Sequence, residues 1–270
     1  MPRMTPQRCL LAVAVAGLAM LTAACAPRNQ ALRIKTQWVG YESLCLAEDL
    51  GKLPPGVTLQ HGARAADTLA ALRAGTVEAG TLTLDEMLDA RAAGTPLTEV
   101  LIFDSSSGAD VLLAWRDDRV DAVVSHEPTA AQLQAEGAQR LFDSRQMPDT
   151  IFDVLAMRTD RLAGREAALR KAIETHFEMH AYINQNRDDA VYRIAAHQGV
   201  TAADVRRAMA GVTVPDVGGN RYALHDGSRF DAAARRVHRL MTGRGMLGQQ
   251  SSLDGLFSAD FLPLPRLTAP

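Results

Sequence analysis

Residues 32–51 read LRIKTQWVGYESLCLAEDLG and set the pattern that the rest of the chain repeats. The first four, from Leu32 to Lys35, predict a strand, and Glu42 to Leu50 predict a helix that ends at Gly51. Short apolar runs alternate with amphipathic helices along the following residues, which is typical of an α/β protein with largely parallel strands. The fold class predicted from this pattern is therefore α/β.

The same pattern continues to the end of the chain. Further strands are predicted at 57–60, 77–82, 97–103, 109–115, 120–124, 140–142 and 152–157. Helices are predicted at 68–74, 85–93, 128–135, 165–184, 188–197, 202–210 and 230–242. Alternating strands and helices thus come first, and helices dominate the last third.

The composition is that of an ordinary globular protein. The chain has 270 residues, of which 47% are hydrophobic and 22% are charged. A formal net charge of -2 and a pI near 6.4 exclude the general attraction on which nucleic-acid binders rely. We expect no nucleic-acid partner.

The N-terminus resembles a bacterial lipoprotein signal. Arg3 and Arg8 precede an apolar run at 10–21, which is too short for a membrane span. The run ends in Leu-Thr-Ala-Ala-Cys, so Cys25 is the predicted lipidation site after removal of residues 1–24. A plain secretory signal is the alternative. Either way the protein is predicted to leave the cytoplasm, and the lipid would anchor it in the periplasm to a membrane of the cell envelope.

Only one cysteine would remain in the folded part. Cys9 would be lost with the signal and Cys25 would carry lipid, so Cys45 has no partner for an internal disulfide. Apolar neighbours predict that Cys45 is a buried, inert thiol.

Three blocks carry a resemblance to a known family. They are Trp38 to Leu44, the block from Leu72 to Glu86, and Val120 to Pro128. In order and spacing they resemble the ABC-transporter solute-binding proteins of the nitrate, sulfonate, taurine and thiamine-precursor type. The resemblance implies a bilobed periplasmic-binding-protein fold of type II, closure around a small solute, no cofactor, and docking of a monomer to a membrane permease.

The chain departs from the family in its second lobe. Only residues 116–119 separate the strand ending at Trp115 from the next one, so about sixty residues are missing if a βαβ unit takes roughly 30 or more. We therefore predict a shortened second lobe at 116–150, a first lobe at 25–115, and a return strand with C-terminal helices at 151–270.

The resemblance also implies ligand-binding residues. Trp38 and Tyr41 would form an aromatic wall at the end of the first strand, although Trp38 would equally suit the core. Glu42 either contacts a cationic ligand or stabilises the start of its helix.

Later strand ends supply further ligand candidates. Thr83 and Asp85 begin one helix and Glu127 begins another, while Ser107 and Asp110 flank a hydroxyl-rich loop at 105–108. Helix capping and an ordinary turn are the alternative roles. Because the carboxylates would repel an anion, they favour a neutral or cationic solute such as an amine or a pyrimidine, while the family also permits sulfonates and nitrate-like anions.

No pattern indicates catalysis. His176 and His180 lie four residues apart, as in some zinc sites, but no third ligand accompanies them, so no metal site is predicted. The prediction is a binding protein and not an enzyme. Two alternatives remain: a partly deleted member that serves as a non-transport envelope lipoprotein, and a periplasmic enzyme of the thiamine-precursor type, which needs a His and Cys arrangement that the sequence does not display.

Overall fold

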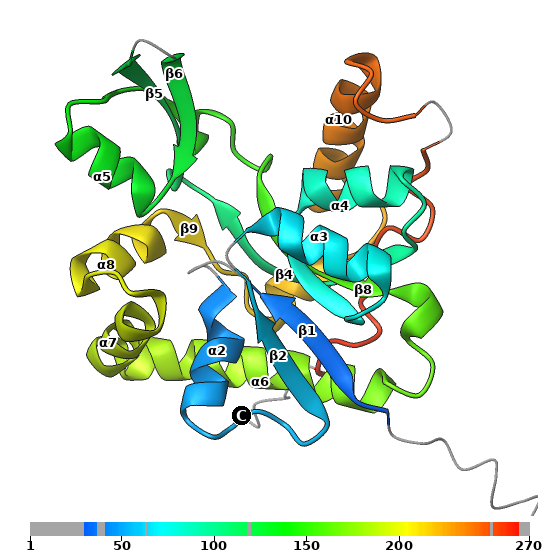
Figure 1. Cartoon of the computed structure of the whole chain (residues 1–270). Coiled ribbons are helices and arrows are strands. Elements are labelled where there is room, and N and C mark those ends of the chain that lie inside the picture. The colour runs from blue at the N-terminus through cyan, green and yellow to red at the C-terminus, as the bar shows by residue number, and fades with distance from the viewer. Residues whose placement is uncertain (1–29, 37–40, 63, 118–119, 249–250, 265–270) are drawn as a thin grey trace, which may run out of the picture.

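A computed structural model describes residues 30–36, 41–62, 64–117, 120–248 and 251–264. It contains two β-sheets of unequal size, joined by two crossing segments at residues 106–109 and 144–151 (Figure 1). The larger sheet has the strand order β2-β1-β3-β8-β4-β9. Its strands are β1 (Leu32–Thr36), β2 (Val57–His61), β3 (Ala79–Thr83), β4 (Leu97–Ser106), β8 (Phe152–Arg158) and β9 (Val212–Thr213).

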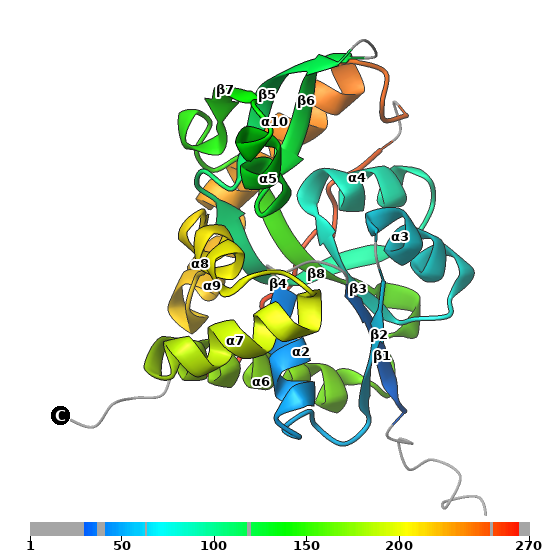
Figure 2. The same ribbon diagram turned by 60° about the vertical axis from the view of Figure 1, so that its left-hand side comes forward.

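Helices cover both faces of the larger sheet. Helices α3 (Ala65–Ala74) and α4 (Leu84–Ala92) lie on one face, and α2 (Glu42–Asp49) and α6 (Glu166–Gln185) lie on the other (Figures 1 and 2). Strand β8 is buried at every position because both of its faces are covered. The main hydrophobic core therefore lies around β3, β8 and β4.

The C-terminal third is mostly helical, as predicted. It comprises α7 (Arg187–Gln198), α8 (Ala202–Ala210), α9 (Val217–Ala223) and α10 (Arg229–Gly243). Thr201 and Asp204 form a capping box at the start of α8. None of the helices in the described part of the chain has both the length and the apolar character that crossing a bilayer requires.

The smaller sheet has the order β6-β5-β7 and is built from contiguous sequence. Its strands are β5 (Asp110–Asp117), β6 (Val120–His126) and β7 (Gln139–Asp143), and α5 (Thr129–Ala135) packs on one face. The 3₁₀ turns η2 (Ser144–Gln146) and η3 (Thr159–Arg161) flank the return strand β8. The chain thus leaves the larger sheet at the end of β4 and returns to it at the start of β8.

The prediction of largely parallel strands is correct for only part of the described sheets. Strands β1, β2, β3 and β4 run in one direction, whereas β8 is antiparallel to both β3 and β4, and the smaller sheet is antiparallel. The reason is that β8 returns from the smaller sheet against the direction of the early strands and inserts between β3 and β4. Strand β9 and helix α9 were not predicted, since β9 has two residues and Gly218 and Gly219 lower the helix propensity of α9.

Candidate functional site

One edge of the larger sheet collects the ends of four strands beside the crossing segments. The carboxyl ends of β1, β3 and β4 meet there with the start of β8, since Thr83 pairs with Asp153 and Asp104 pairs with the same residue from the other side. In open α/β sheets, ligands bind outside the carboxyl ends of the strands. A ligand-binding site is therefore expected at this end of the sheet.

Tyr41 lies at this edge, as the resemblance implies. Its side chain is buried, and its hydroxyl donates a hydrogen bond to Asp153 Oδ1 at 2.8 Å. Its ring packs edge to face on Phe103, with 5.3 Å between ring centroids. Asp153 was not among the predicted site residues, because nothing near it in the sequence indicates that β8 pairs with β3.

Two buried carboxyl groups face each other at the same place. Asp104 is 0% exposed and Asp153 is 7% exposed, and they are register partners across β4 and β8. Burial raises the pKa of Asp104 well above its usual value, and the charge of Asp153 raises it further. Burial likewise raises the pKa of Asp153, against the hydrogen bond from Tyr41. The pair therefore holds a proton near neutral pH.

Thr83 and Asp85 have the capping roles given as the alternative. Thr83 and Glu86 form a capping box at the start of α4, in which the Thr83 N–H donates to Glu86 Oε2 at 2.9 Å. Asp85 is exposed in the first turn. Burial raises the pKa of Glu86, which favours its protonated form, and Glu86 is a third carboxyl group near Asp153 and Tyr41.

The hydroxyl-rich loop belongs largely to β4. Ser106 and Ser144, which lie on the two crossing segments, share a hydrogen bond of 2.7 Å between their Oγ atoms. The Ser106 Oγ also accepts a hydrogen bond from the Asp110 N–H at 3.2 Å. Ser107 is exposed, and its N–H donates to the Gly211 carbonyl. Ser106, and not the predicted Ser107, thus contributes the side-chain contacts here.

Glu127 is tied into the smaller sheet. It is 4% exposed, lies 3.6 Å from the Arg140 guanidinium and accepts a hydrogen bond from the Ala131 N–H. Its backbone N–H donates to the Ala109 carbonyl, close to the crossing segment. Trp38 and Cys25 lie outside the described residues.

Glu42 is buried at the start of α2 and does not reach the paired carboxyl groups. Its carboxylate contacts His197 Nδ1 at 3.1 Å and accepts a hydrogen bond from the Gln198 side chain. It lines a pocket of about 250 Å³ between α2, α6, α7 and α8. Phe103 and His176 lie on the wall of the same pocket, so Phe103 separates it from Tyr41 by one ring.

His176 is neutral in this wall. Its Nδ1 lies 2.8 Å from Ser43 Oγ, whereas its Nε2 has no hydrogen-bond partner among the described residues. Burial lowers the pKa of His176 to about 3. Of the pair His176 and His180, His176 therefore serves in packing and in the hydrogen bond with Ser43.

A second, smaller pocket lies next to Glu42 and was missed by the sequence analysis. Its volume is about 160 Å³, and Cys45, His61 and His197 line it. Cys45 is buried, as predicted, and burial raises its pKa. A His and Cys arrangement does exist, which corrects the statement that none is present. The arrangement cannot be recognised in the sequence because its three residues, at positions 45, 61 and 197, lie far apart along the chain.

The fold and the site geometry define a bilobed periplasmic-binding-protein fold. The chain is similar to the periplasmic aliphatic sulphonate binding protein SsuA from Escherichia coli, with a TM-score of 0.68 and 16% identity over 84% of this chain and 97% of that one. It is also similar to the alkanesulfonate-binding protein SsuA from Xanthomonas axonopodis pv. citri bound to MOPS, with a TM-score of 0.67 and 15% identity over 86% of this chain and 99% of that one.

A third similar structure confirms the fold class. It is a Candida albicans protein with the generic periplasmic binding protein structural fold, with a TM-score of 0.67 and 12% identity over 87% of this chain and 98% of that one. No protein-family model matches the chain, and no curated protein is significantly similar to it. The predicted bilobed α/β fold is confirmed.

Proposed function

We propose that the protein is the solute-binding component of an ABC-type import system, which binds a small organic solute and passes it to a membrane permease. The observation that carries the proposal is the group of Tyr41, Asp104 and Asp153 at the sheet edge beside the crossing segments. Carboxyl groups with strongly shifted pKa values at such a place are typical of functional sites. The similar SsuA structures are named as sulphonate-binding proteins and support the general role.

The acidic edge favours a cationic or neutral solute over a sulfonate. Asp104, Asp153 and Glu86 approach the same edge, and any of them that is ionised repels an anion. A protonated amine, or a pyrimidine that donates N–H groups, would instead stabilise the ionised carboxyl groups. The predicted contacts of Trp38, Ser107, Asp110 and Glu127 with this solute belong to the proposal.

The location of the protein is part of the same proposal. We infer that residues 1–24 are removed, that Cys25 carries lipid, and that the monomer stays at the periplasmic face of a cell-envelope membrane. The boundaries 25–115, 116–150 and 151–270 belong to the proposal, except that β5 lies in the smaller sheet, which moves the start of the second lobe to about residue 110. Labelling of cells with a tritiated fatty acid checks the lipid, which should be absent after Cys25→Ala.

Thermal unfolding with and without solutes tests the binding function. Amines, pyrimidines, sulfonates, nitrate and aromatic acids are each added in large excess. Binding to the native state alone adds about 2.7 kcal/mol at a hundredfold excess over Kd, which moves the midpoint by several degrees. We expect an amine or a pyrimidine to raise the midpoint.

Variants locate the binding site. Asp153→Asn and Tyr41→Phe should abolish the solute-induced shift, while Asp188→Asn, on the exposed surface of α7, should keep it. A shift with sulfonates only would contradict the solute class, and a shift that survives Asp153→Asn would contradict the site.

A partly deleted, non-transport lipoprotein is the second candidate function. The observation that favours it lies on the smaller sheet, where α5 covers one face while Val124 and Leu141 are 77% and 59% exposed. Exposed apolar side chains on a sheet of three strands are compatible with a face that a covering layer occupies in longer relatives. If no solute of any class shifts the midpoint, this second candidate replaces the first.

A further inference from the structure

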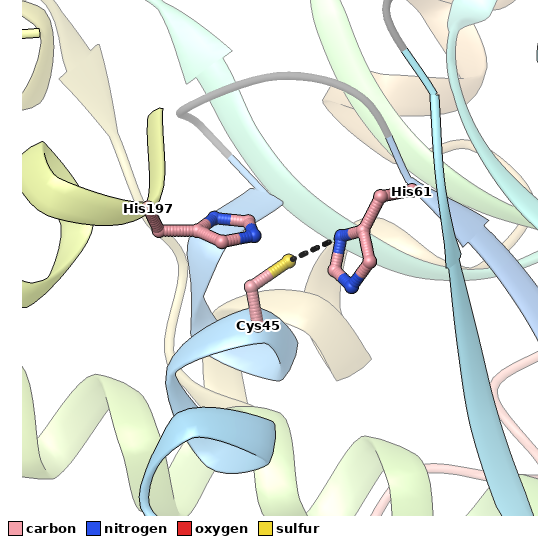
Figure 3. Close-up of side chains that lie close together, drawn as sticks. All are labelled: Cys45, His61 and His197. Atoms are coloured by element: carbon pink, nitrogen blue, oxygen red, sulfur yellow. Dashed lines mark hydrogen bonds between the residues drawn. The ribbon is translucent and has the colours of Figure 1, made fainter. Parts of the chain in front are cut away.

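Three side chains that can bind a metal ion converge from separate elements. Cys45 comes from α2, His61 ends β2, and His197 lies near the end of α7. Their ligand atoms all lie within 4.8 Å of one another, and Cys45 Sγ is 4.0 Å from His61 Nδ1. Figure 3 shows both imidazole rings facing the sulfur across one small space. This is the cluster that lines the pocket of about 160 Å³.

Each histidine is oriented by a carboxylate through its other ring nitrogen. His61 Nε2 lies 2.8 Å from Glu48 Oε2, which leaves Nδ1 toward the sulfur. His197 Nδ1 lies 3.1 Å from Glu42 Oε2, which leaves His197 Nε2 as the nitrogen that can bind a metal ion. A histidine that binds a metal almost always donates its remaining N–H to a carboxylate, a carbonyl or water, and this contact fixes the tautomer and the ring. Both histidines therefore already have the outer contacts of metal ligands.

We propose that Cys45, His61 and His197 bind one zinc ion. Zinc takes thiolate sulfur at about 2.3 Å and imidazole nitrogen at about 2.0–2.1 Å, so a tetrahedral ion places its ligand atoms roughly 3.3–3.6 Å apart. The distance between Cys45 Sγ and His61 Nδ1 needs to contract by about 0.5 Å and the other distances by no more than about 1.5 Å, which side-chain rotation supplies. The thiol proton leaves to solvent as the Zn–S bond forms.

The donor set selects the ion. Thiolate and imidazole ligands suit zinc and other late first-row metals, whereas calcium and magnesium require oxygen ligands. Three protein ligands leave the fourth position of a tetrahedron open, as in sites where zinc binds water or a small molecule. The proposal goes beyond the proposed function, because the site forms whether or not the chain serves an importer.

Zinc binding is measured on the reduced, tag-free protein by competition with a chromogenic chelator, and Co²⁺ is used as a spectroscopic probe. We expect one equivalent of zinc to bind tightly. The Co²⁺ form should show a thiolate-to-metal charge-transfer band together with the visible bands of a tetrahedral ion. A Co²⁺ spectrum without the thiolate band overturns the proposal.

Variants assign the ligands. Cys45→Ser should remove the charge-transfer band, and His61→Gln and His197→Gln should each weaken zinc binding severely. Glu48→Gln, which leaves the ligands intact, should weaken it by about 10–100-fold. His225→Gln, at an exposed histidine outside the cluster, is the matched control and should bind as the unaltered protein does.

The pair on α6 is the competing location. His180→Gln should leave zinc binding unchanged, and a loss in this variant with retention in His197→Gln contradicts the proposal. If Cys45→Ser fails to fold by circular dichroism, His197→Gln decides alone, since this side chain is 38% exposed and its replacement leaves the core intact. Zinc affinity equal to that of the unaltered protein in folded His197→Gln overturns the site.

Discussion

Two titratable side chains, Glu99 and His176, are buried in this fold. Glu99 is 0% exposed, and both of its carboxylate oxygens are without a hydrogen-bond partner in the described part of the chain. Burial raises the pKa of Glu99 well above its usual value, while burial lowers that of His176. Both side chains are neutral in the folded protein, so each links stability to pH with an opposite sign.

Replacing Glu99 by Gln should stabilise the protein more as the pH rises. In the unfolded chain Glu99 ionises above about pH 4.3, whereas in the fold it stays protonated, so unfolding releases a proton and stability falls with rising pH. The advantage of Glu99→Gln should grow by about 1.4 kcal/mol per pH unit above that point, until the pKa of the folded state is reached. Urea unfolding at pH 5, 6.5 and 8 measures it. Equal differences at all three values would contradict a raised pKa.

His176 should destabilise the protein in acid. The unfolded chain takes up a proton at this residue below about pH 6.5, whereas the folded protein resists protonation down to about pH 3. Its contribution to the free energy of unfolding is therefore complete above pH 6.5 and decreases by about 1.4 kcal/mol per unit below it. His176→Asn should flatten the dependence between pH 6 and 4 in urea titrations. A slope as steep as that of the exposed control His225→Asn would contradict this.

At the site, local pattern was enough for some residues and not for others. Tyr41 was predicted from the family resemblance, and the structure places it beside the carboxyl ends of the strands, while its contact with a solute stays a prediction. Asp104 and Asp153 were missed, since their pairing depends on β8 inserting beside β4. The cluster of Cys45, His61 and His197 was missed for the same reason, because α7 reaches α2 only through tertiary packing. Residues that meet across distant segments leave no signal in a single sequence.

At the scale of elements, the periodicity predicted most helices and strands but not the strand directions. Helix α6 repeats buried residues every three or four positions, so its amphipathic pattern is unambiguous. Strand direction depends instead on where the chain returns, and no local pattern records this. The segment between β4 and β5 and the turn before β9 meet at Gly211, whose carbonyl accepts hydrogen bonds from the N–H groups of Ser107 and Ala109.

Gly211→Ala should therefore disturb this junction. A Cβ atom at Gly211 would lie 2.9 Å from the Cα and N atoms of Ala109, closer than packing allows. We expect a loss of roughly 1–3 kcal/mol, as for overpacked cores, measured as a lower urea midpoint. Gly243→Ala is the control, because nothing lies within 4 Å of its added Cβ, and it should be neutral or slightly stabilising. Equal effects of the two substitutions would contradict the close contact.

At the scale of the whole molecule, the two sheets differ in how well they are covered. The larger sheet is enclosed by helices, whereas β6 is an edge strand of the smaller sheet and carries the exposed Val124. An exposed apolar edge promotes pairing with other chains. The smaller sheet is therefore the place where self-association should begin.

Val124→Lys should reduce self-association without lowering stability. The side chain is 77% exposed, so the substitution should change the free energy of unfolding by no more than about 0.5 kcal/mol. Light scattering during refolding should fall, because a lysine on an edge strand opposes strand addition. Gln185→Lys, at the exposed end of α6, introduces the same charge away from both edge strands of the smaller sheet. An equal decrease in scattering with that control would show that net charge alone is responsible.

The insertion of β8 between β3 and β4 also fixes the order in which a growing chain can fold. Strands β3 and β4 emerge from the ribosome in succession, yet each lacks its neighbour until residues 152–158 have been made. The smaller sheet needs only residues 110–143 and can pair its strands through short connections beforehand. The edges of β3 and β4 that face β8 thus stay unpaired until β8 has been made, and unpaired strand edges expose a growing chain to pairing with other chains.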